Sequence, residues 1–147
     1  MLPRPHDHPM GSLTMADGMT TIDRLTPVTK RIDRAAIRLY AELTDDFNPI
    51  HVDPDFAAKT PMKGIIAHGL LSVNLLWQSL RRSLGEAAVS DATLDIRFLR
   101  PVREDDVVTA GGERRADGDG YDVWIDNQHG ETVIAGRIRH GAGRAAS

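Results

Sequence analysis

A carboxylate and an imidazole lie five positions apart in residues 46–51, which read DFNPIH. Proline disfavours helical backbone at the residue before it, so Asn48 is expected to be extended. We therefore expect Asp46 and His51 to lie on an irregular loop, where their side chains can converge on one point. A carboxylate and an imidazole around one water molecule form a pair suited to general acid–base catalysis. Asn48 is expected to hold this turn through side-chain bonds to neighbouring backbone.

A second chemical feature follows at His68 and Gly69, where a long apolar segment begins. If this segment is helical, its first backbone N–H groups are unpaired donors at the positive end of the helix dipole. Such donors can stabilise a developing oxyanion. We expect Gly69 to supply one of them, because a residue without Cβ permits close approach, although it can also be a close-packing glycine. His68 is expected to support the loop by packing or positioning it.

Three blocks of sequence carry a resemblance to a known family. Residues 40–58 read YAELTDDFNPIHVDPDFAA, residues 65–71 read IIAHGLL, and a weaker third block, residues 98–102, reads FLRPV. This pattern resembles the MaoC-like family, which comprises the (R)-specific enoyl-CoA hydratases and related 3-hydroxyacyl-thioester dehydratases. The resemblance covers roughly residues 25 to 140, nearly the whole folded portion.

The resemblance implies an α+β hot-dog fold, in which an antiparallel sheet wraps around a long central helix. It implies reversible hydration of a trans-2-enoyl-CoA with Asp46 and His51 as catalytic residues, Gly69 as oxyanion donor, and Asn48 and His68 in support. It also implies an acyl-CoA substrate, no cofactor, and a homodimer or dimer of dimers. Two positions depart from the family pattern: Asp45 replaces a glycine, and Trp77 stands where some members have a serine near the reacting centre. Trp77 is therefore a candidate substrate-binding residue, with core packing as the alternative.

Several alternatives stay open at this point. A hot-dog thioesterase is a rival, although such enzymes often carry an acidic residue on the central helix and residues 68–84 have none. A non-catalytic acyl-binding subunit is a second rival, which the intact pair of Asp46 and His51 disfavours. A metal site at the pair would need His68 as its third ligand, and we expect no metal. Arg81 and Arg82 most simply complement a helix C-terminus, with contact to the phosphates of coenzyme A as the alternative.

Composition bounds these hypotheses. The chain has 147 residues, 41% of them hydrophobic and 27% charged, which is typical of a single soluble globular domain. A net charge of −3 does not suggest nucleic-acid binding, and no apolar run is long enough to span a membrane. The absence of cysteine excludes disulfides and a thiol nucleophile. The sequence shows no signal peptide, so we expect a cytoplasmic location.

Hydrophobic periodicity predicts the order of elements. We expect a disordered extension over residues 1–20, whose His6-Asp7-His8 triplet is a solvated tail, one domain over 21–140, and a flexible tail over 141–147. Within the domain, helical spacing and caps predict helices over 33–43, 54–58 and 68–84. A first strand is expected within 20–31. Alternating patterns predict further strands over 94–98, 107–115, 121–127 and 132–139, with glycine-containing turns between the last three.

Overall fold

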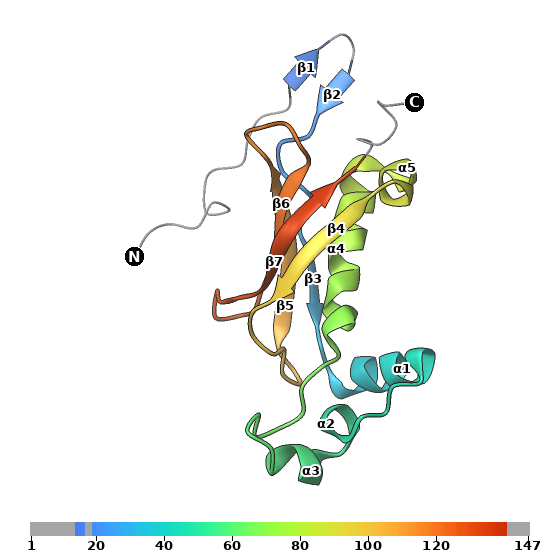
Figure 1. Ribbon diagram of the computed structural model, residues 1–147, viewed down its shortest axis with the longest axis vertical. Helices are drawn as coiled ribbons and strands as arrows, with labels where there is room; N and C mark the ends of the chain where they lie inside the picture. Colours follow the sequence, from blue (N-terminus) through green and yellow to red (C-terminus); the bar gives the residue numbers. More distant parts are fainter. Residues whose placement is uncertain (1–13, 17–18, 141–147) are drawn as a thin grey trace.

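The structure is a computed structural model that describes residues 14–16 and 19–140 (Figure 1). Most of the described chain forms one antiparallel sheet with a long helix along one face. In chain order the elements are β1 (Thr14–Ala16), β2 (Met19–Thr21), β3 (Val28–Arg31), α1 (Arg34–Thr44), α2 (Pro49–Val52), α3 (Pro54–Ala58), α4 (Gly69–Leu84), α5 (Glu86–Ser90), β4 (Thr93–Phe98), β5 (Val107–Arg114), β6 (Tyr121–Asp126) and β7 (Thr132–Arg139).

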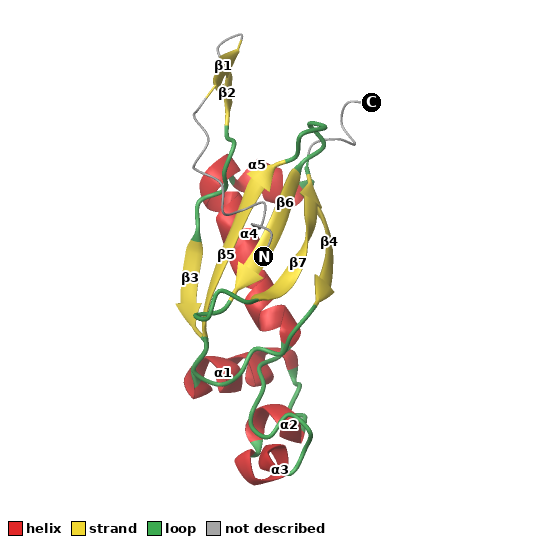
Figure 2. Ribbon diagram, turned by 90° about the vertical axis from the view of Figure 1, so that its left-hand side faces the viewer, coloured by secondary structure: helices red, strands yellow, loops and turns green. Residues whose placement is uncertain are grey.

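The main sheet has five strands in the order β3-β5-β6-β7-β4, and every neighbouring pair is antiparallel (Figure 2). Strands β5, β6 and β7 are joined by the two predicted turns, in which Gly118, Gly120 and Gly130 have positive φ. Strand β4 follows α4 in the chain and pairs with β7, so β3 and β4 are the two edges. The sheet thus closes around α4 with the C-terminal strands at its centre.

The core lies between α4 and the inner face of the sheet. Alternate residues of β6 are buried because successive strand side chains point to opposite faces. They meet the apolar face of α4, where Leu76 and Leu80 are fully buried. The helix is also tied to the chain before β3, since the Ser79 hydroxyl donates to the carbonyl of Thr26 at 2.6 Å. This packing holds the N-terminus of α4, and hence Gly69, in a fixed place.

The predicted α+β architecture is confirmed, with differences at particular elements. The helices expected over 33–43, 54–58 and 68–84 correspond to α1, α3 and α4, and the first strand shortens to Val28–Arg31. The expectation that His51 lies on an irregular loop is wrong, because His51 belongs to the one-turn helix α2. Helix α5 was not predicted. Among the described residues, none of the helices combines the length and apolar character that a membrane crossing requires.

The two terminal segments can be compared with expectation only in part. Residues 1–13, 17–18 and 141–147, which include the His6-Asp7-His8 triplet, lie outside the described residues. Within the expected N-terminal extension, β1 and β2 pair as a short antiparallel sheet, where we predicted no regular structure. Figure 1 shows this pair beyond one end of the main sheet, opposite the end that carries α1, α2 and α3.

Candidate active site

The end of α1 places Asp46 by means of a left-handed residue. Asp45, the C-cap of α1, has φ 55° and ψ 38°, and the backbone N–H groups of both Asp45 and Asp46 donate to the carbonyl of Ala41. Glycine is the common residue at such a helix end because it has no Cβ, and aspartate is among the few others that tolerate it. The departure from the family glycine is therefore explained by backbone geometry. Asp45 forms the same left-handed turn at a small conformational cost, and its side chain is exposed.

The turn after Asp46 is closed by side-chain oxygens. The Asp46 carboxylate accepts the N–H of Asn48 at 3.3 Å, and the Asn48 amide oxygen accepts the N–H of Ile50 at 3.1 Å. Asn48 is the N-cap of α2, with ψ 129° as expected before a proline, and Pro49 occupies the first helical position. A proline there pre-sets helical backbone, which explains why α2 forms where we expected a loop. The predicted structural role of Asn48 is consistent with these bonds.

His51 is held by a backbone carbonyl. Its Nδ1 lies 2.7 Å from the oxygen of Ile66, and since a carbonyl only accepts, Nδ1–H is the donor. The Ile66 N–H in turn donates to the carbonyl of Ile50 at 3.2 Å, which joins α2 to the segment before α4. In the neutral ring, Nε2 then carries the lone pair and is the nitrogen that can accept a proton.

His68 forms the buried floor beneath this ring. Its Nε2–H donates to the carbonyl of Asp46 at 2.9 Å, and its ring stacks on that of His51 with centroids 3.9 Å apart. The ring of Tyr40 also packs against that of His68, with centroids 5.0 Å apart. His68 therefore contacts both members of the predicted pair, which fits the supporting role expected for it. Its Nδ1 and the hydroxyl of Ser72, one turn further along α4, are buried without a hydrogen-bond partner among the described residues.

Asp46, His51 and His68 converge, with one ligand-type atom from each lying within 4.8 Å of the other two. Such a trio also has the composition of a metal site. The two rings, however, are stacked with centroids 3.9 Å apart and planes only 27° from parallel, so their in-plane lone pairs lie in two planes that do not meet close to the rings. Both rings cannot then bond a single zinc ion at its usual distance of about 2.0–2.1 Å. The arrangement suits a shared proton or water, and the absence of a bound metal stays a prediction.

Gly69 begins α4, with His68 as an N-cap whose side chain makes no capping bond. The N–H groups of Gly69 and Leu70 have no partner among the described residues, so the helix presents free donors as predicted. A Cβ built on Gly69 would lie 2.6 Å from Cε1 of Phe98, at the end of β4. Gly69 is thus required for close packing, which was the alternative interpretation. The two roles are compatible, because close packing uses the missing Cβ and the oxyanion role uses the backbone N–H.

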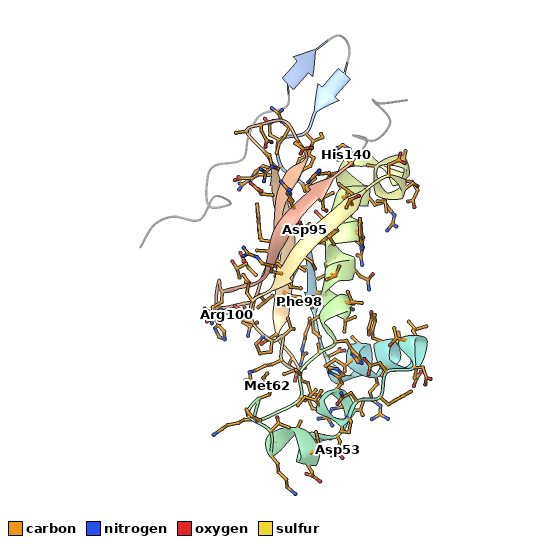
Figure 3. All side chains as sticks on the ribbon, in the orientation of Figure 1. Asp53, Met62, Asp95, Phe98, Arg100 and His140 are labelled. Atoms are coloured by element: carbon orange, nitrogen blue, oxygen red, sulfur yellow. The ribbon has the colours of Figure 1, made fainter. Side chains whose placement is uncertain are left out.

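A cavity of about 690 Å³ lies beside the candidate site. His51 and Gly69 lie on its wall, and the rest of the lining is mostly apolar, with Met62, Leu70 and Phe98 prominent. Figure 3 shows Met62, Phe98 and Arg100 gathered around the end of the sheet nearest α2 and α3. The cavity therefore offers an apolar arm of a ligand a route to the imidazole of His51 and to the free donors of α4.

Trp77 does not line this cavity. It lies two turns further along α4, half-buried against the core, and faces a second cleft of about 600 Å³ between α1 and α4 that Tyr40 and Leu39 also line. Arg81 and Arg82 lie at the opposite end of α4, where Arg81 pairs with Glu86 at 2.6 Å. The helix is about 24 Å long, so these arginines are far from His51. Their position fits the simpler interpretation, in which Arg81 and Arg82 complement the dipole at the C-terminus of α4.

Sequence reasoning missed two contributors to the site. Ile66 acts through its carbonyl, which no side-chain pattern reveals. Phe98 is the last residue of the strand predicted over 94–98, and the structure shows it 55% exposed and lying over Gly69. Its place in the FLRPV block was the available signal.

The fold and this constellation define a hot-dog protein with a candidate acid–base site at the N-terminus of its central helix. The profile of the MaoC like domain family matches residues 18–133, and the chain belongs to that family. The (R)-specific enoyl-CoA hydratase of Aeromonas caviae is 36% identical over 83 residues, which cover 56% of this chain and 62% of that protein. The corresponding enzyme of Rhodospirillum rubrum is 37% identical over 83 residues, covering 56% and 58%. These matches span about three-fifths of the length of the relatives.

Similarity to solved structures extends over more of the chain than these sequence matches do. The (R)-hydratase from A. caviae involved in PHA biosynthesis superimposes with a TM-score of 0.69 at 28% identity, covering 84% of this chain and 97% of that one. The unliganded R-hydratase from Pseudomonas aeruginosa gives a TM-score of 0.68 at 26% identity, covering 82% and 81%. The predicted hot-dog fold is confirmed by these neighbours.

Proposed function

We propose that this protein catalyses the reversible hydration of trans-2-enoyl-CoA to (3R)-3-hydroxyacyl-CoA, a hydro-lyase reaction. The observation that carries the proposal is the convergence of Asp46 with His51, whose side chain lines an apolar cavity that the N-terminus of α4 also bounds. Relatives named (R)-specific enoyl-CoA hydratase and 3-hydroxybutyryl-CoA dehydratase support it.

In the proposed reaction a water molecule lies between the Asp46 carboxylate and Nε2 of His51. As its oxygen bonds to C3 of the enoyl group, the pair takes one proton from it. The electrons of the double bond move toward the thioester oxygen, where the Gly69 N–H stabilises the enolate. A proton then returns from the pair to C2, which completes the addition of water. Proton transfer is assigned to the pair as a whole, without dividing base and acid between Asp46 and His51.

Two rival functions fit less well. Thioesterases of this fold often carry an acidic residue on the central helix, and α4 reads GLLSVNLLWQSLRRSL with none. A non-catalytic acyl-binding subunit needs no ordered proton-handling pair. Here the rings of His51 and His68 are each held in place by a hydrogen bond to a backbone carbonyl. Fold alone does not separate these functions, so the argument rests on the site.

Hydration of crotonyl-CoA, followed by loss of enoyl absorbance, tests the proposal without added metal or nucleotide. We expect Asp46→Asn and His51→Ala each to lower turnover by about 10²–10⁴-fold, the usual contribution of a general acid or base. Both variants should melt close to the wild type, since Asp46 is exposed and His51 half-buried. Release of free thiol with unchanged enoyl absorbance would identify a thioesterase instead.

We also propose that the active species is a homodimer or a dimer of dimers. Edge strand β4 ends in a group of exposed apolar side chains, Phe98, Leu99 and nearby Leu70, beside the cavity. An exposed edge of this kind favours pairing with another strand. Light scattering should give at least twice the chain mass, and a fully active monomer would contradict the proposal. A cytoplasmic location is a prediction that cell fractionation can check.

A further inference from the structure

Two polar atoms at the start of α4 are buried without a hydrogen-bond partner among the described residues. They are Nδ1 of His68, a residue that is 5% exposed, and the hydroxyl oxygen of Ser72, a residue that is fully buried. Ser72 comes one helical turn after His68, a rise of about 6 Å along the axis. A buried polar group without a hydrogen bond destabilises the fold, so both atoms call for an explanation.

Packing alone does not account for a serine at position 72. The buried face of α4 is otherwise apolar apart from Ser79, and alanine would be a better helix former without a polar atom. The other three serines in the described part of the chain, Ser79, Ser83 and Ser90, each donate to a backbone carbonyl. Two of these carbonyls belong to the residue four positions earlier, which is a common outlet for a serine within a helix. Ser72 makes no such bond, so its hydroxyl is available to another partner.

The ring of His68 determines what its own missing partner must supply. Its Nε2–H donates to the carbonyl of Asp46 at 2.9 Å. Charge is costly to bury, which favours the neutral ring, and in that ring Nδ1 carries a lone pair. A buried lone pair requires a hydrogen-bond donor, and a serine hydroxyl is one. His68 and Ser72 therefore each hold the group that the other lacks.

His68 in turn links α4 to both members of the candidate pair. Its Nε2–H holds the main chain of Asp46, and its ring stacks on that of His51 with centroids 3.9 Å apart. The ring of His51 is otherwise held at Nδ1, by the carbonyl of Ile66, so its tilt depends on the surface beneath it. A rotation of His68, or a move of its proton to Nδ1, would break the bond to Asp46 and disturb that surface.

We propose that Ser72 is a positioning residue. Its hydroxyl donates to Nδ1 of His68, directly or through one enclosed water molecule, and holds that ring as the Nε2–H tautomer beneath Asp46 and His51. The inference rests on the proposed function and adds to it a residue that touches neither the substrate nor the reacting atoms. Such support matters because a misplacement of about 1 Å in a catalytic group lowers turnover by about 10²-fold.

Two serine variants on α4 test this role. Ser72→Ala removes the hydroxyl, and Ser83→Ala is the matched control three turns away, where the hydroxyl donates to the carbonyl of Ser79 and accepts the N–H of Thr26. Nitrogen NMR of the histidine rings, with the His68 signals assigned by their loss in His68→Gln, should show a neutral ring protonated at Nε2 in the wild type and in Ser83→Ala. In Ser72→Ala the Nδ1 resonance should move downfield, toward that of an unbonded imidazole nitrogen. The melting temperature of Ser72→Ala should fall by about 2–4 °C, because a buried hydrogen bond is lost.

Steady-state hydration of crotonyl-CoA measures the effect on catalysis. Because the expected displacement is smaller than about 1 Å, Ser72→Ala should lower kcat by about 5- to 10-fold with KM within about twofold, and Ser83→Ala should match the wild type. A wild-type His68 protonated at Nδ1, an unchanged Nδ1 resonance in Ser72→Ala, or a higher melting temperature of that variant would overturn the inference. A shifted resonance with unchanged kcat would overturn the positioning role. The NMR and melting measurements require no turnover, so they test the bond even if crotonyl-CoA is not hydrated, and failure of the proposed function is thereby distinguished.

Discussion

Adding a single methyl group at Gly69 probes both roles assigned to that residue. In Gly69→Ala the new Cβ would lie 2.6 Å from Cε1 of Phe98 and 3.1 Å from Cδ1 and Cζ. Ordinary carbon–carbon contacts are about 3.5–4.0 Å, so the ring must move by roughly an ångström or the start of α4 must shift. The backbone N–H that we assign to the enolate is retained in this variant. Any loss of activity therefore reports displacement, and not removal, of the donor.

The free energy of unfolding and the turnover should respond differently to Gly69→Ala. Phe98 is 55% exposed, so turning its ring outward forfeits about 1 kcal/mol of a full burial worth roughly 1.5–3 kcal/mol. Replacing glycine by alanine at a helical position returns up to about 1 kcal/mol. The free energy of unfolding should therefore change by less than about 1 kcal/mol. A shift of about 1 Å at a positioned donor can lower turnover by about 10²-fold.

Steady-state hydration of crotonyl-CoA and urea unfolding measure the two effects, and Phe98→Leu supplies the control. If the methyl group acts by steric displacement, the double variant Gly69→Ala/Phe98→Leu should recover most of the turnover that Gly69→Ala loses, relative to Phe98→Leu alone. Wild-type activity in Gly69→Ala would refute the tight contact between Gly69 and Phe98. An equal loss in the single and double variants would show that the position of Phe98 is not the cause.

Three further outcomes follow from the structure. Asp45→Gly should leave activity within about twofold and stability within about 1 kcal/mol, because glycine accepts φ 55° without strain; a large loss of turnover would make Asp45 the functional carboxylate. Trp77→Ser should lower stability by about 2–4 kcal/mol and leave chain-length preference unchanged, since Trp77 packs on the core outside the cavity; new activity on longer enoyl-CoAs would instead show that the acyl arm enters the second cleft. Tyr121→Phe removes a 2.6 Å bond to the carbonyl of Ile22 and should cost about 1 kcal/mol at neutral pH. Burial raises the pKa of Tyr121 above 10.0, so its stabilising contribution is complete below about pH 10 and is lost as pH rises further; urea titrations should show a smaller alkaline loss in the variant.

The elements that sequence analysis located well are those whose signal is local. Helix α4 shows a long apolar run ended by Gly85, whose φ of 89° suits a residue without Cβ at a helix C-terminus. Strand β6 alternates strictly, and its turns contain glycines with positive φ. Periodicity and turn chemistry depend on near neighbours, so they can be seen in the sequence without knowledge of the fold.

The parts that sequence analysis missed depend on contacts across the fold. Helix α2 is one turn long, too short for a periodic signal, and is stabilised by the bond between Ile66 and Ile50. The outward position of Phe98 depends on where β4 ends relative to α4. The convergence of Asp46 and His51 was expected from the motif, but the stacking of His68 beneath them is a tertiary arrangement that spacing alone does not reveal.

The two imidazoles of the candidate site are anchored by main-chain oxygens, that of Ile66 for His51 and that of Asp46 for His68. Every amino acid presents the same carbonyl, so substitution at position 66 leaves the anchor of His51 chemically intact. The geometry of the site should consequently tolerate substitution of most surrounding side chains, but it should be sensitive to changes in the path of the backbone. A one-residue insertion between positions 52 and 65 would misplace the anchor of His51 more severely than most substitutions in the same segment. Diverging sequences of this fold can therefore vary around the site while the number of residues between its parts stays constrained.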